Sequence, residues 1–538
     1  GIVGTVDGIQ EDMPTGNVIG GSRGEPAPNV FNMPVHEYNP VFHVGNINEA
    51  EVVIGIEGQA TDKATAGTAG NAPRIYGSVY GGGRDGHMRR DSKVTVYSGE
   101  IGNAYTDANK TAVGTSTLTH LQWQHRGNVY GSGSGIGKYK FDYQDGKGEV
   151  EGLSFLAGCV ARFSEVDIQG GIIHRNVYGG GSVAGTGFPK FYGQDYEPYK
   201  KDLVGDLANQ GKQSMNTVTV SGGEIGESGY GGNVFGASRG EENLAVGRLA
   251  DEVFATSIWT KVDITGGTIY NNVYGGGEVG TVKMDTEVNL KGGEIKHNAY
   301  GGGKGTTKIP ADVGGNVTVK LNEGVSSTAT GCIVDKLFGC NDQNGTPKGH
   351  ALVHVHATQS RGEGKKIEDK TVLPTDSLGF AAYAYDVTAV YGGGDLAEYN
   401  PASPTDYAQV IIDGCSETSI KQVYGGGNAA PVPATNVRVN ACYIINEVFG
   451  GGNGLDNYTR DGEWYANPGA NVGYHALAYY KTKTDDGYVA ATHGTGEDEA
   501  NRYKAITYAN AGTKAERQNE ANGYAYGTGW ATTTVTGG

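Results

Sequence analysis

Short stretches in which polar and apolar residues strictly alternate recur along this chain, and each ends at a pair of glycines. Residues 217–223, 261–267 and 287–293 show the pattern, with Val, Ile or Leu at every second position. A period of two with β-branched residues predicts a half-buried β-strand. Because Gly adopts a positive φ without steric cost, the glycine pair predicts a sharp corner where each strand ends.

A second recurring element, here called the ladder motif, is a Val-aromatic-Gly tripeptide that follows the corner. An isolated apolar residue such as Ile269 stands shortly before the aromatic, and Asn usually precedes the Val, as in residues 272–277. The first copy carries Ile19 instead of an aromatic but belongs with the others, because residues 17–25 closely parallel residues 233–241. The eleven copies begin at Val18, Val79, Val129, Val177, Val234, Val273, Ala299, Leu337, Val390, Val423 and Val448.

The spacing of the ladder motifs predicts the architecture. The shortest intervals run from Tyr274 to Tyr300 and from Tyr424 to Phe449, and a period in the twenties indicates a solenoid. A longer interval, such as that from Tyr178 to Phe235, is then one turn that carries an insertion. Short strands of about five residues joined by Gly-rich corners fill one turn of this length.

Helical periodicity is nearly absent, so the chain is predicted to be an all-β protein. The expected fold is a right-handed parallel β-helix, a β-solenoid of about 11–13 coils. Coils stacked at ~4.8 Å would make a rod roughly 50 Å long.

Equivalent positions of successive coils lie directly above one another in such a fold, so Asn is expected to hydrogen-bond to Asn, and ring to stack on ring. The Val before each aromatic favours Val inside and the ring outside, whereas exchange of the aromatic with Phe and Ile favours a buried ring; we expect the ring to lie outward or on a corner. The predicted structural ladder comprises Tyr80, Tyr130, Tyr178, Phe235, Tyr274, Tyr300, Phe338, Tyr391, Tyr424 and Phe449.

The chain between the motifs is polar, rich in Tyr and variable in length. Residues 455–532 are expected to form a Tyr-rich insertion or a C-terminal extension, and residues 533–538 repeat the first half of a coil. We therefore expect the chain to be a fragment of a longer protein or a subunit continued by its neighbour, with any targeting segment removed or outside it. The solenoid is predicted over 1–454, with its main insertions at 104–126, 138–160, 186–214, 240–258 and 341–388.

Insertions of solenoids tend to gather on one face, which is often the binding face. Aromatic side chains on polar loops suit contact with saccharides or proteins. The candidate contact residues are Tyr192, Tyr196, Tyr199, Trp464, Tyr465, Tyr479 and Tyr480.

The charge and composition of the chain further restrict the functions that are expected for it. The chain has a formal net charge of −17 and no apolar stretch long enough to span a membrane, so neither a nucleic-acid partner nor a membrane-spanning helix is expected. Five cysteines in 538 residues do not make a disulfide framework. Cys415 and Cys442 stand roughly one coil apart and could meet in neighbouring coils, but small buried apolar side chains are the simpler interpretation.

Two patterns are candidate metal sites. Residues 451–458 match a calcium-binding nonapeptide once and would use Asp456, but such sites need several tandem copies, so a Gly-rich corner is favoured and no cofactor is expected. His350, His354 and His356 alternate along a predicted strand and share a face. No carboxylate or Cys stands at matching spacing, so an exposed strand face is favoured there.

Enzymatic cleavage of a polysaccharide would require carboxylates or a basic residue that converge on one groove. The candidates fall into two groups that are four or more coils apart, in loops of mixed charge, so no catalytic residue is predicted. The first group is Asp85, Arg89, Arg90 and Asp91, and the second is Asp395 with Glu398.

Residues 264–277, which contain a strand end, a glycine pair and a ladder motif, resemble the large Gly-rich β-helical surface proteins of Bacteroidetes such as Prevotella and Bacteroides. The resemblance covers the repeats and not the insertions. It implies an exported, cell-surface or secreted protein with an adhesive or structural role, and it supplies no catalytic residues.

The sequence as a whole favours an extracellular β-solenoid that forms a stiff stalk or self-assembling fibre, with loops that contact glycans, host proteins or sister subunits. Exposed coil ends are strand edges, which favour homo-oligomers or filaments by end-to-end stacking. The alternatives are a polysaccharide lyase or glycoside hydrolase of β-helix fold, which would need a carboxylate cleft, and a trimeric phage-type tail fibre, which would need a three-fold interface.

Overall fold

The computed structural model describes the chain in segments separated by gaps. Side-chain surroundings are not described for residues 9–10, 13–14, 138–142, 149–153, 458–460 and 463–465. The described residues are 1–5, 9–10, 13–24, 47–58, 72–86, 88–104, 126–135, 138–142, 149–153, 157–187, 214–228, 231–240, 255–325, 331–359, 385–403, 405–414, 418–454, 458–460, 463–465, 470–473 and 531–537.

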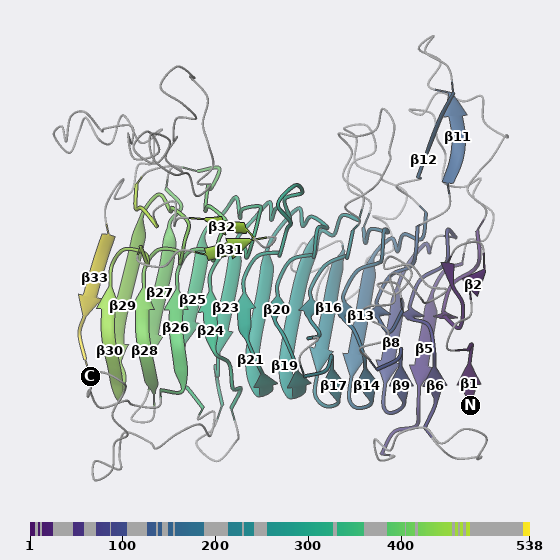
Figure 1. Cartoon of the computed structure of the whole chain (residues 1–538), viewed down its shortest axis with the longest axis horizontal. Coiled ribbons are helices and arrows are strands. Elements are labelled where there is room, and N and C mark those ends of the chain that lie inside the picture. The colour runs from purple at the N-terminus through teal and green to yellow at the C-terminus, as the bar shows by residue number, and fades with distance from the viewer. Residues whose placement is uncertain are drawn as a thin grey trace.

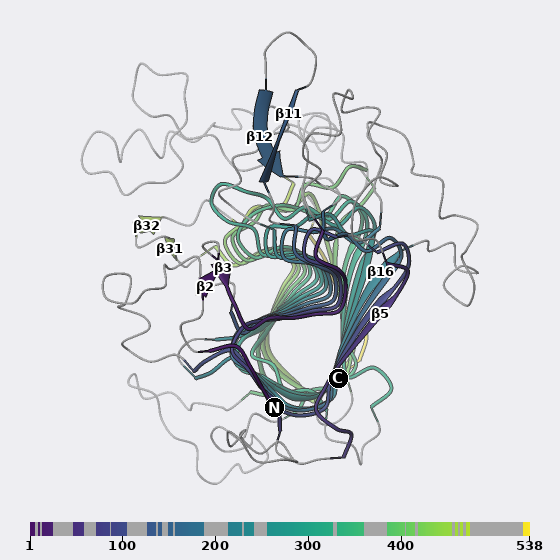
Figure 2. The ribbon, with the colours of Figure 1, turned by 90° about the vertical axis from the view of Figure 1, so that its right-hand side faces the viewer.

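The described residues form strands and turns but no helix, and their strands build two parallel sheets that run the length of the molecule (Figure 1). In the end-on view, successive coils lie one behind another (Figure 2). The fold is therefore an all-β parallel β-solenoid, as predicted.

The broad sheet has 16 strands. Its members are β1 (Ile2–Val3), β5 (Ala50–Ile54), β6 (Arg74–Ile75), β8 (Ser92–Val96), β9 (Glu100–Ile101), β13 (Phe163–Ile168), β14 (Ile172–Ile173), β16 (Met215–Val220), β17 (Glu224–Ile225), β19 (Trp259–Ile269), β21 (Thr286–Ile295), β23 (Val317–Leu321), β25 (Ala351–Val355), β27 (Ala408–Asp413), β29 (Thr435–Ala441) and β33 (Ala531–Val535).

The narrow sheet has 11 strands, and every one of them coincides with a predicted ladder motif. The count of repeats in the sequence therefore equals the count of coils that carry this sheet. The strands are β4 (Val18–Ile19), β7 (Val79–Tyr80), β10 (Val129–Tyr130), β15 (Val177–Tyr178), β18 (Val234–Phe235), β20 (Val273–Tyr274), β22 (Asn298–Tyr300), β24 (Lys336–Phe338), β26 (Val387–Tyr391), β28 (Ser419–Tyr424) and β30 (Ile444–Phe449).

Three small antiparallel hairpins lie outside the two sheets. They pair β2 (Ile9–Gln10) with β3 (Met13–Pro14), β11 (Lys138–Asp142) with β12 (Glu149–Leu153), and β31 (Tyr458–Arg460) with β32 (Glu463–Tyr465).

The register of the broad sheet brings like residues together. Between β16 and β19, Val218 pairs with Val262 and Val220 with Ile264, and the same rows continue into β21. These side chains point inward and, with the Val of each ladder motif, form one continuous apolar core. The alternation seen in the sequence is thus the division between this core and the outer face.

Glycine serves two different purposes in each coil. The second Gly of the corner pair, as in Gly267, has a positive φ of 77°, as predicted. The Gly after the aromatic is needed instead for close approach: a Cβ on Gly275 would lie 2.3 Å from the carbonyl oxygen of Gly301 in the next coil. A side chain at that position would therefore force neighbouring coils apart.

The boundaries of the insertions differ from expectation in one place. The sequence predicts a single insertion over residues 341–388, but they contain β25, which continues the broad sheet between β23 and β27. The alternation of His350, His354 and His356 indicates a strand at this place, but the bounds of the predicted insertion did not exclude it. Residues 533–538 are expected to begin a coil, and β33 does pair in parallel with β29.

The cysteines have no disulfide among the described residues. Cys159, Cys332 and Cys340 are buried thiols outside any disulfide, and burial raises the pKa of the Cys159 thiol to about 12. They serve as small core residues. Cys442 is free and half-buried, whereas Cys415 lies outside the described residues, so the pairing considered for these two stays a prediction.

Candidate functional site

The narrow sheet carries one unbroken column of aromatic rings. Each ring stacks on the next with centroids 4.7–4.9 Å apart and planes within 10° of parallel. This spacing is that of neighbouring strands, so strand pairing by itself brings the rings into contact. The predicted ladder is confirmed at Tyr80, Tyr130, Tyr178, Phe235, Tyr274, Tyr300, Phe338, Tyr391, Tyr424 and Phe449.

The expectation that these rings lie outward or on a corner is wrong about their exposure. In β15, Val177 and Tyr178 are both fully buried. A strand places neighbouring side chains on opposite faces, so Val177 joins the main core while Tyr178 joins a second core on the other side of the narrow sheet. The ring points away from the Val core. In the end-on view, the chain that follows the narrow sheet turns back across the other side of that sheet (Figure 2).

An Asn column runs beside the rings in the first half of the rod. The side-chain oxygen of Asn176 accepts a hydrogen bond from the backbone N–H of Asn233 at 2.8 Å, and that of Asn272 accepts one from Asn298 at 2.9 Å. The side-chain amide of Asn272 also donates to the hydroxyl of Tyr274 at 3.0 Å. The expected Asn-to-Asn bonding therefore occurs mainly from side chain to the next backbone.

A column of polar residues stands four positions after each aromatic, and we call it the corner row. In four consecutive coils the row holds Arg239, Glu278, Lys304 and Asp342, so the sign of the charge alternates. Lys304 donates to Glu278 Oε1 at 3.0 Å. Opposite charges at the strand spacing attract, whereas like charges would repel. From β7 onward the row is Arg84, Ser134, Ser182, Arg239, Glu278, Lys304, Asp342, Asp395, Asn428 and Asn453.

The corner row also accepts hydrogen bonds from two of the buried ring hydroxyls. Tyr178 donates to Glu278 Oε2 at 2.7 Å, and Tyr274 donates to Asp342 Oδ2 at 2.8 Å. Burial raises the pKa of both tyrosines well above the ordinary value, and the carboxylates raise it further. The rings therefore keep their protons and act as donors.

The pKa values of two carboxylates in the corner row, Glu278 and Asp395, shift in opposite directions. Burial alone would raise the pKa of Glu278, but Lys304, Arg239 and the Tyr178 hydroxyl outweigh it and hold the pKa below its ordinary value. Asp395 follows the acidic Asp342 in the row, and burial raises its pKa despite the hydrogen bond that its Oδ1 accepts from Asn428 at 2.7 Å.

A hydroxyl column, which the sequence analysis missed, joins the broad sheet to the narrow one. Ser164, Thr260 and Thr286 each donate to the carbonyl oxygen of the glycine that follows an aromatic, at 2.5–2.6 Å. The signal is present in the sequence as a Ser or Thr at a constant separation from that glycine.

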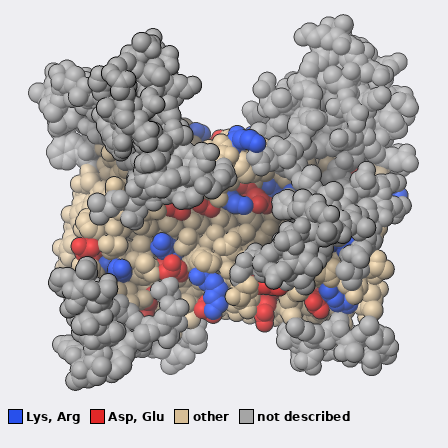
Figure 3. All heavy atoms as spheres, in the orientation of Figure 1, with Lys and Arg blue, Asp and Glu red and all other residues tan. Residues whose placement is uncertain are grey.

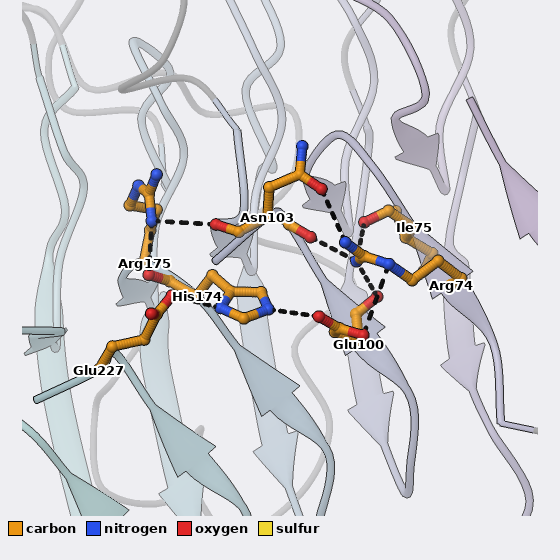
Figure 4. Close-up of polar contacts among 8 residues, drawn as sticks. Arg74, Ile75, Glu100, Asn103, His174, Arg175 and Glu227 are labelled. Atoms are coloured by element: carbon orange, nitrogen blue, oxygen red, sulfur yellow. Dashed lines mark hydrogen bonds and ion pairs between the residues drawn. The ribbon is translucent and has the colours of Figure 1, made fainter. Parts of the chain in front are cut away.

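A buried ionic network lies at the short strands of the broad sheet (Figure 4). The imidazole of His174 contacts Glu100 Oε1 through Nε2 at 2.7 Å and Glu227 Oε1 through Nδ1 at 2.6 Å. Arg74 lies 3.5 Å from Glu100 Oε2 and donates to Asn103 Oδ1 at 2.7 Å. Because β6, β9, β14 and β17 are neighbours, the network ties four consecutive coils together.

The geometry of this network suits a clamp better than a catalytic site. General acid–base catalysis needs a nitrogen or oxygen that can reach a substrate. Both ring nitrogens of His174 are occupied by Glu100 and Glu227, and the His174 side chain is only 6% exposed. The sequence could not reveal the cluster, because Glu100 and His174 are far apart along the chain with an insertion between them.

The three histidines of β25 and its flank divide into two groups. His354 and His356 lie with ring centroids 3.8 Å apart and planes tilted by 33°, whereas His350 contacts Tyr407 edge-on. His354 Nε2 lies 2.6 Å from Asp413 Oδ2 on β27. Carboxylates do therefore stand near the histidines, contrary to expectation, because neighbouring coils supply them.

The described residues hold no group of three or more His, Cys, Asp or Glu that could bind a metal ion. Burial and the neighbouring His354 lower the pKa of His356, which favours a neutral ring beside its partner. Asp456, the calcium candidate, lies outside the described residues.

The residues considered for catalysis do not converge. Asp91 forms two contacts with the guanidinium of Arg162, and Arg90 lies 3.4 Å from Glu49. Asp85 is buried with a positive φ of 61°, which marks it as a turn residue. Asp395 belongs to the coil of β26, seven strands along the narrow sheet from β7, or about 34 Å at the strand spacing. Arg89 is exposed and Glu398 is half-buried.

The predicted ligand-contact aromatics remain predictions. Trp464 and Tyr465 belong to β32, but their side chains are not described. The others lie outside the described residues, namely Tyr192, Tyr196, Tyr199, Tyr479 and Tyr480.

The described part of the surface shows no clustered basic patch on the face in Figure 3. Acidic and basic side chains lie close to one another there, with neutral surface between them. Many form pairs between neighbouring coils, such as Lys93 with Glu165 at 2.9 Å.

The fold and its columns define the class of this protein as a parallel β-solenoid with stacked aromatic and polar ladders. No protein-family model, curated protein or solved structure matches the chain. In the part of the chain that the structure describes, we find no helix whose length and apolar character would let it cross a membrane.

Proposed function

We propose that this protein is a structural and adhesive β-solenoid, a stiff rod outside the cell whose copies associate end to end. The observation that carries the proposal is the unbroken aromatic ladder from Tyr80 to Phe449. Bending or shearing the rod would separate stacked rings and strand hydrogen bonds in every coil.

The total stacking free energy of the aromatic ladder supports a mechanical role. A stacked aromatic pair contributes roughly 1 kcal/mol beyond its buried area, so the nine pairs contribute on the order of 10 kcal/mol. Each contribution couples one coil to the next. The His174 clamp and the alternating corner row add further coupling between coils.

The two ends of the described stack differ from its sides. Strands β1, β4 and β5 at one end and β30 and β33 at the other each pair with a single neighbour. Of the eight exposed large apolar side chains among the described residues, all but Met284 belong to these end regions: Ile2, Val3, Val53, Ile56, Tyr443, Phe449 and Val535. Unpaired edges with apolar side chains template association.

The occupant that fits these ends is a second copy of the chain. All strands of both sheets run parallel, so one end of a copy can pair with the opposite end of another without inversion. Val448 and Phe449 would then meet Val18 and Ile19, which continues both the Val core and the aromatic column.

We extend the proposal to an extracellular location and to contacts with glycans, host proteins or sister subunits through the insertions. The support is the resemblance of residues 264–277 to Gly-rich surface proteins of Bacteroidetes. The acidic surface with its many paired charges also suits a protein that keeps apart from nucleic acid.

Negative-stain electron microscopy across a concentration series tests the assembly. We expect rods of one narrow width whose length grows with concentration. Val535→Lys places a charge on the core side of the end strand β33 and is expected to shorten the rods, because a charged edge resists pairing. Met284→Lys is the matched control, since Met284 is 41% exposed but lies between β19 and β21 in the middle of the stack.

Two results would contradict the proposal. Particles of constant length at every concentration would exclude end-to-end association, and equal shortening by Val535→Lys and Met284→Lys would show that the ends are not the contact surface. Release of reducing sugars or unsaturated products from polysaccharides by the purified chain would favour the enzyme instead.

A further inference from the structure

The outer face of the broad sheet is hollowed where β5, β8, β13 and β16 lie side by side. The hollow has a volume of about 560 Å³. It follows the first residues of each strand, close to Ile47 and Ser214, where the described chain resumes after two of its gaps. Strand register makes its floor a regular grid, since Glu51, Lys93, Glu165 and Thr217 stand in one row across the four strands.

The grid has an apolar part and a polar part. Residues two apart on a strand share a face, so Phe163 lies beside Glu165 and Met215 beside Thr217 on the outer side. Phe163 is half-buried, and the guanidinium of Arg162 lies 5.6 Å from the centre of its ring. Met215 is paired with Phe163 in the register. The two side chains form an apolar strip that borders the polar row, and Phe163 is its accessible part because Met215 is only 5% exposed.

The polar groups of the hollow are held in place before any ligand arrives. Asp91 accepts from Arg162 Nε at 3.0 Å and from the backbone N–H of Phe163 at 3.2 Å. Lys93 and Glu165 form an ion pair at 2.9 Å across two strands. Fixed acceptors and a fixed ammonium next to an apolar strip lower the entropy that a ligand must lose on binding.

The charges of the hollow nearly cancel, which decides between classes of ligand. Its lining carries the carboxylates of Glu49, Glu51, Asp91 and Glu165. Arg90, Lys93 and Arg162 pair with three of these. One negative charge in excess does not select a polycation, and it disfavours a polyanion. What remains is a nearly neutral surface rich in hydrogen-bonding groups beside the half-buried ring of Phe163.

We propose that this hollow binds a neutral sugar unit of a glycan. A pyranose ring has an apolar face of C–H groups and a rim of hydroxyls that both donate and accept. The apolar face would rest on the strip of Phe163 and Met215, the hydroxyls would donate to Glu51 and Glu165, and Lys93 would donate to a ring or hydroxyl oxygen. Aromatic packing against an apolar face combined with few placed polar groups is the usual chemistry of ligand pockets.

The proposal places a glycan contact on the face of the sheet, where the sequence indicates only the loops. It does not depend on end-to-end assembly. Binding is therefore measured on the dispersed Val535→Lys chain as well as on the native chain, so that a failure of assembly and a failure of binding are separate results.

Isothermal titration calorimetry with cellohexaose, mannohexaose and chitohexaose tests the site, and hexalysine serves as the cationic probe. We expect at least one oligosaccharide to bind. Phe163→Leu, which keeps an apolar side chain but removes the ring, and Glu51→Gln, on an exposed side chain, are each expected to weaken binding about tenfold. Thr219→Val, on the same face of β16 beyond the hollow, is the matched control and should bind as the native chain does.

Three outcomes would overturn the proposal. Binding of none of the three oligosaccharides by a chain that still forms rods would exclude a neutral sugar site. Equal binding by the native chain, Phe163→Leu and Glu51→Gln would place any glycan contact elsewhere. Tighter binding of hexalysine than of every oligosaccharide, abolished by Glu51→Gln, would make the hollow a site for cations.

Discussion

The inner and outer faces of the broad sheet are built by the same strands but differ in how closely their residues repeat from coil to coil. In ten strands of the sheet one inward position holds Val, whereas the outward position next to it changes in charge, size and polarity. The inward residues are Val52, Val94, Val166, Val218, Val262, Val288, Val319, Val353, Val410 and Val437, and their outward neighbours are Glu51, Lys93, Glu165, Thr217, Lys261, Glu287, Thr318, Leu352, Gln409 and Asn436.

The difference follows from what each position meets. An inward side chain packs against the same position of the two neighbouring coils at the strand spacing. A residue type that packs well against itself can therefore occupy this position in every coil. An outward side chain meets water and whatever binds there. Repetition therefore specifies the rod, and variation on the outer face is free to specify contacts.

The corner row is an informative exception, because it lies partly inside yet does not repeat. A charge stacked on its own copy would be repelled at the strand spacing. The sequence Arg239, Glu278, Lys304 and Asp342 avoids this by alternation. A row of this kind also distinguishes one coil from the next, which the Val and aromatic columns do not.

The largest loss of stability is expected when a side chain inside the stack of coils is removed. Tyr274→Ala removes two ring contacts and leaves a cavity, and should lower the free energy of unfolding by about 3–5 kcal/mol. Thr318→Ala on the outer face of β23 is the control and should change it by no more than about 0.5 kcal/mol. Chemical denaturation followed by circular dichroism measures both. Similar losses for the two variants would mean that the inner and outer faces do not differ as described.

A smaller loss of stability is expected from adding a side chain where neighbouring coils approach most closely. Gly275→Ala places a Cβ 2.3 Å from the carbonyl oxygen of Gly301, and overpacking of this kind costs about 1–3 kcal/mol. Gly454→Ala is the control, since a Cβ there meets nothing within 4 Å. The melting temperatures of the two variants provide the comparison. An unchanged Gly275→Ala protein would show that the coils can separate without cost.

The corner row predicts a dependence on pH. Because the pKa of Asp395 is raised in the folded protein, its ionised form is disfavoured there, and this loss of stability sets in as the pH rises above the ordinary Asp value of about 3.9. Asp395→Asn should therefore be more stable than the native chain at pH 7 and equal to it at pH 3. For Glu278, whose pKa is lowered, the sign is opposite: its stabilisation is present at pH 7 and is lost on acidification.

Denaturation of Asp395→Asn, Glu278→Gln and the native chain at several pH values measures these signs. Asp395→Asn keeps the oxygen that accepts from Asn428, so any gain reflects the charge. Curves for the three proteins that stay parallel from pH 3 to pH 7 would show that the row is not electrostatically coupled to folding.

The smallest effect is expected on the outer face. Lys93 and Glu165 form an ion pair, but their side chains are 43% and 48% exposed, and pairs of this kind contribute about 0–1 kcal/mol. Lys93→Gln should accordingly change the unfolding free energy by less than about 1 kcal/mol, and the change should shrink in high salt. A loss as large as that of Tyr274→Ala would remove the contrast between the two faces.

Most of the architecture could be predicted because its signals are local and periodic. Two-residue alternation located the broad-sheet strands, and each copy of the ladder motif became one strand of the narrow sheet. The rows that pair Val218 with Val262 or Tyr274 with Tyr300 follow from stacking equal positions. The predicted insertion at 341–388 wrongly included β25, because it was taken from the long interval between the ladder motifs at Leu337 and Val390, although the alternation at His354 and His356 indicates a strand there.

The candidate site could be predicted only in part. The residues of the aromatic ladder were found, but their burial was not, because a two-residue strand does not show which chain will cover its second face. Contacts such as Tyr178 with Glu278 join positions that are two coils apart in the chain. The clamp that joins Glu100, His174 and Glu227 depends on the length of the insertions between coils, which the repeat pattern does not contain.

The sequence by itself determined the repeating unit, the number of ladder motifs and which residues would stack. The reason is physical: a period of two and a glycine at each corner are properties of a few adjacent residues. The tertiary structure decided what those coils enclose and present, namely the cover over the rings, the alternation of charge along the corner row and the hollow between Glu51 and Thr217. These features arise from residues that meet only when one coil lies on another.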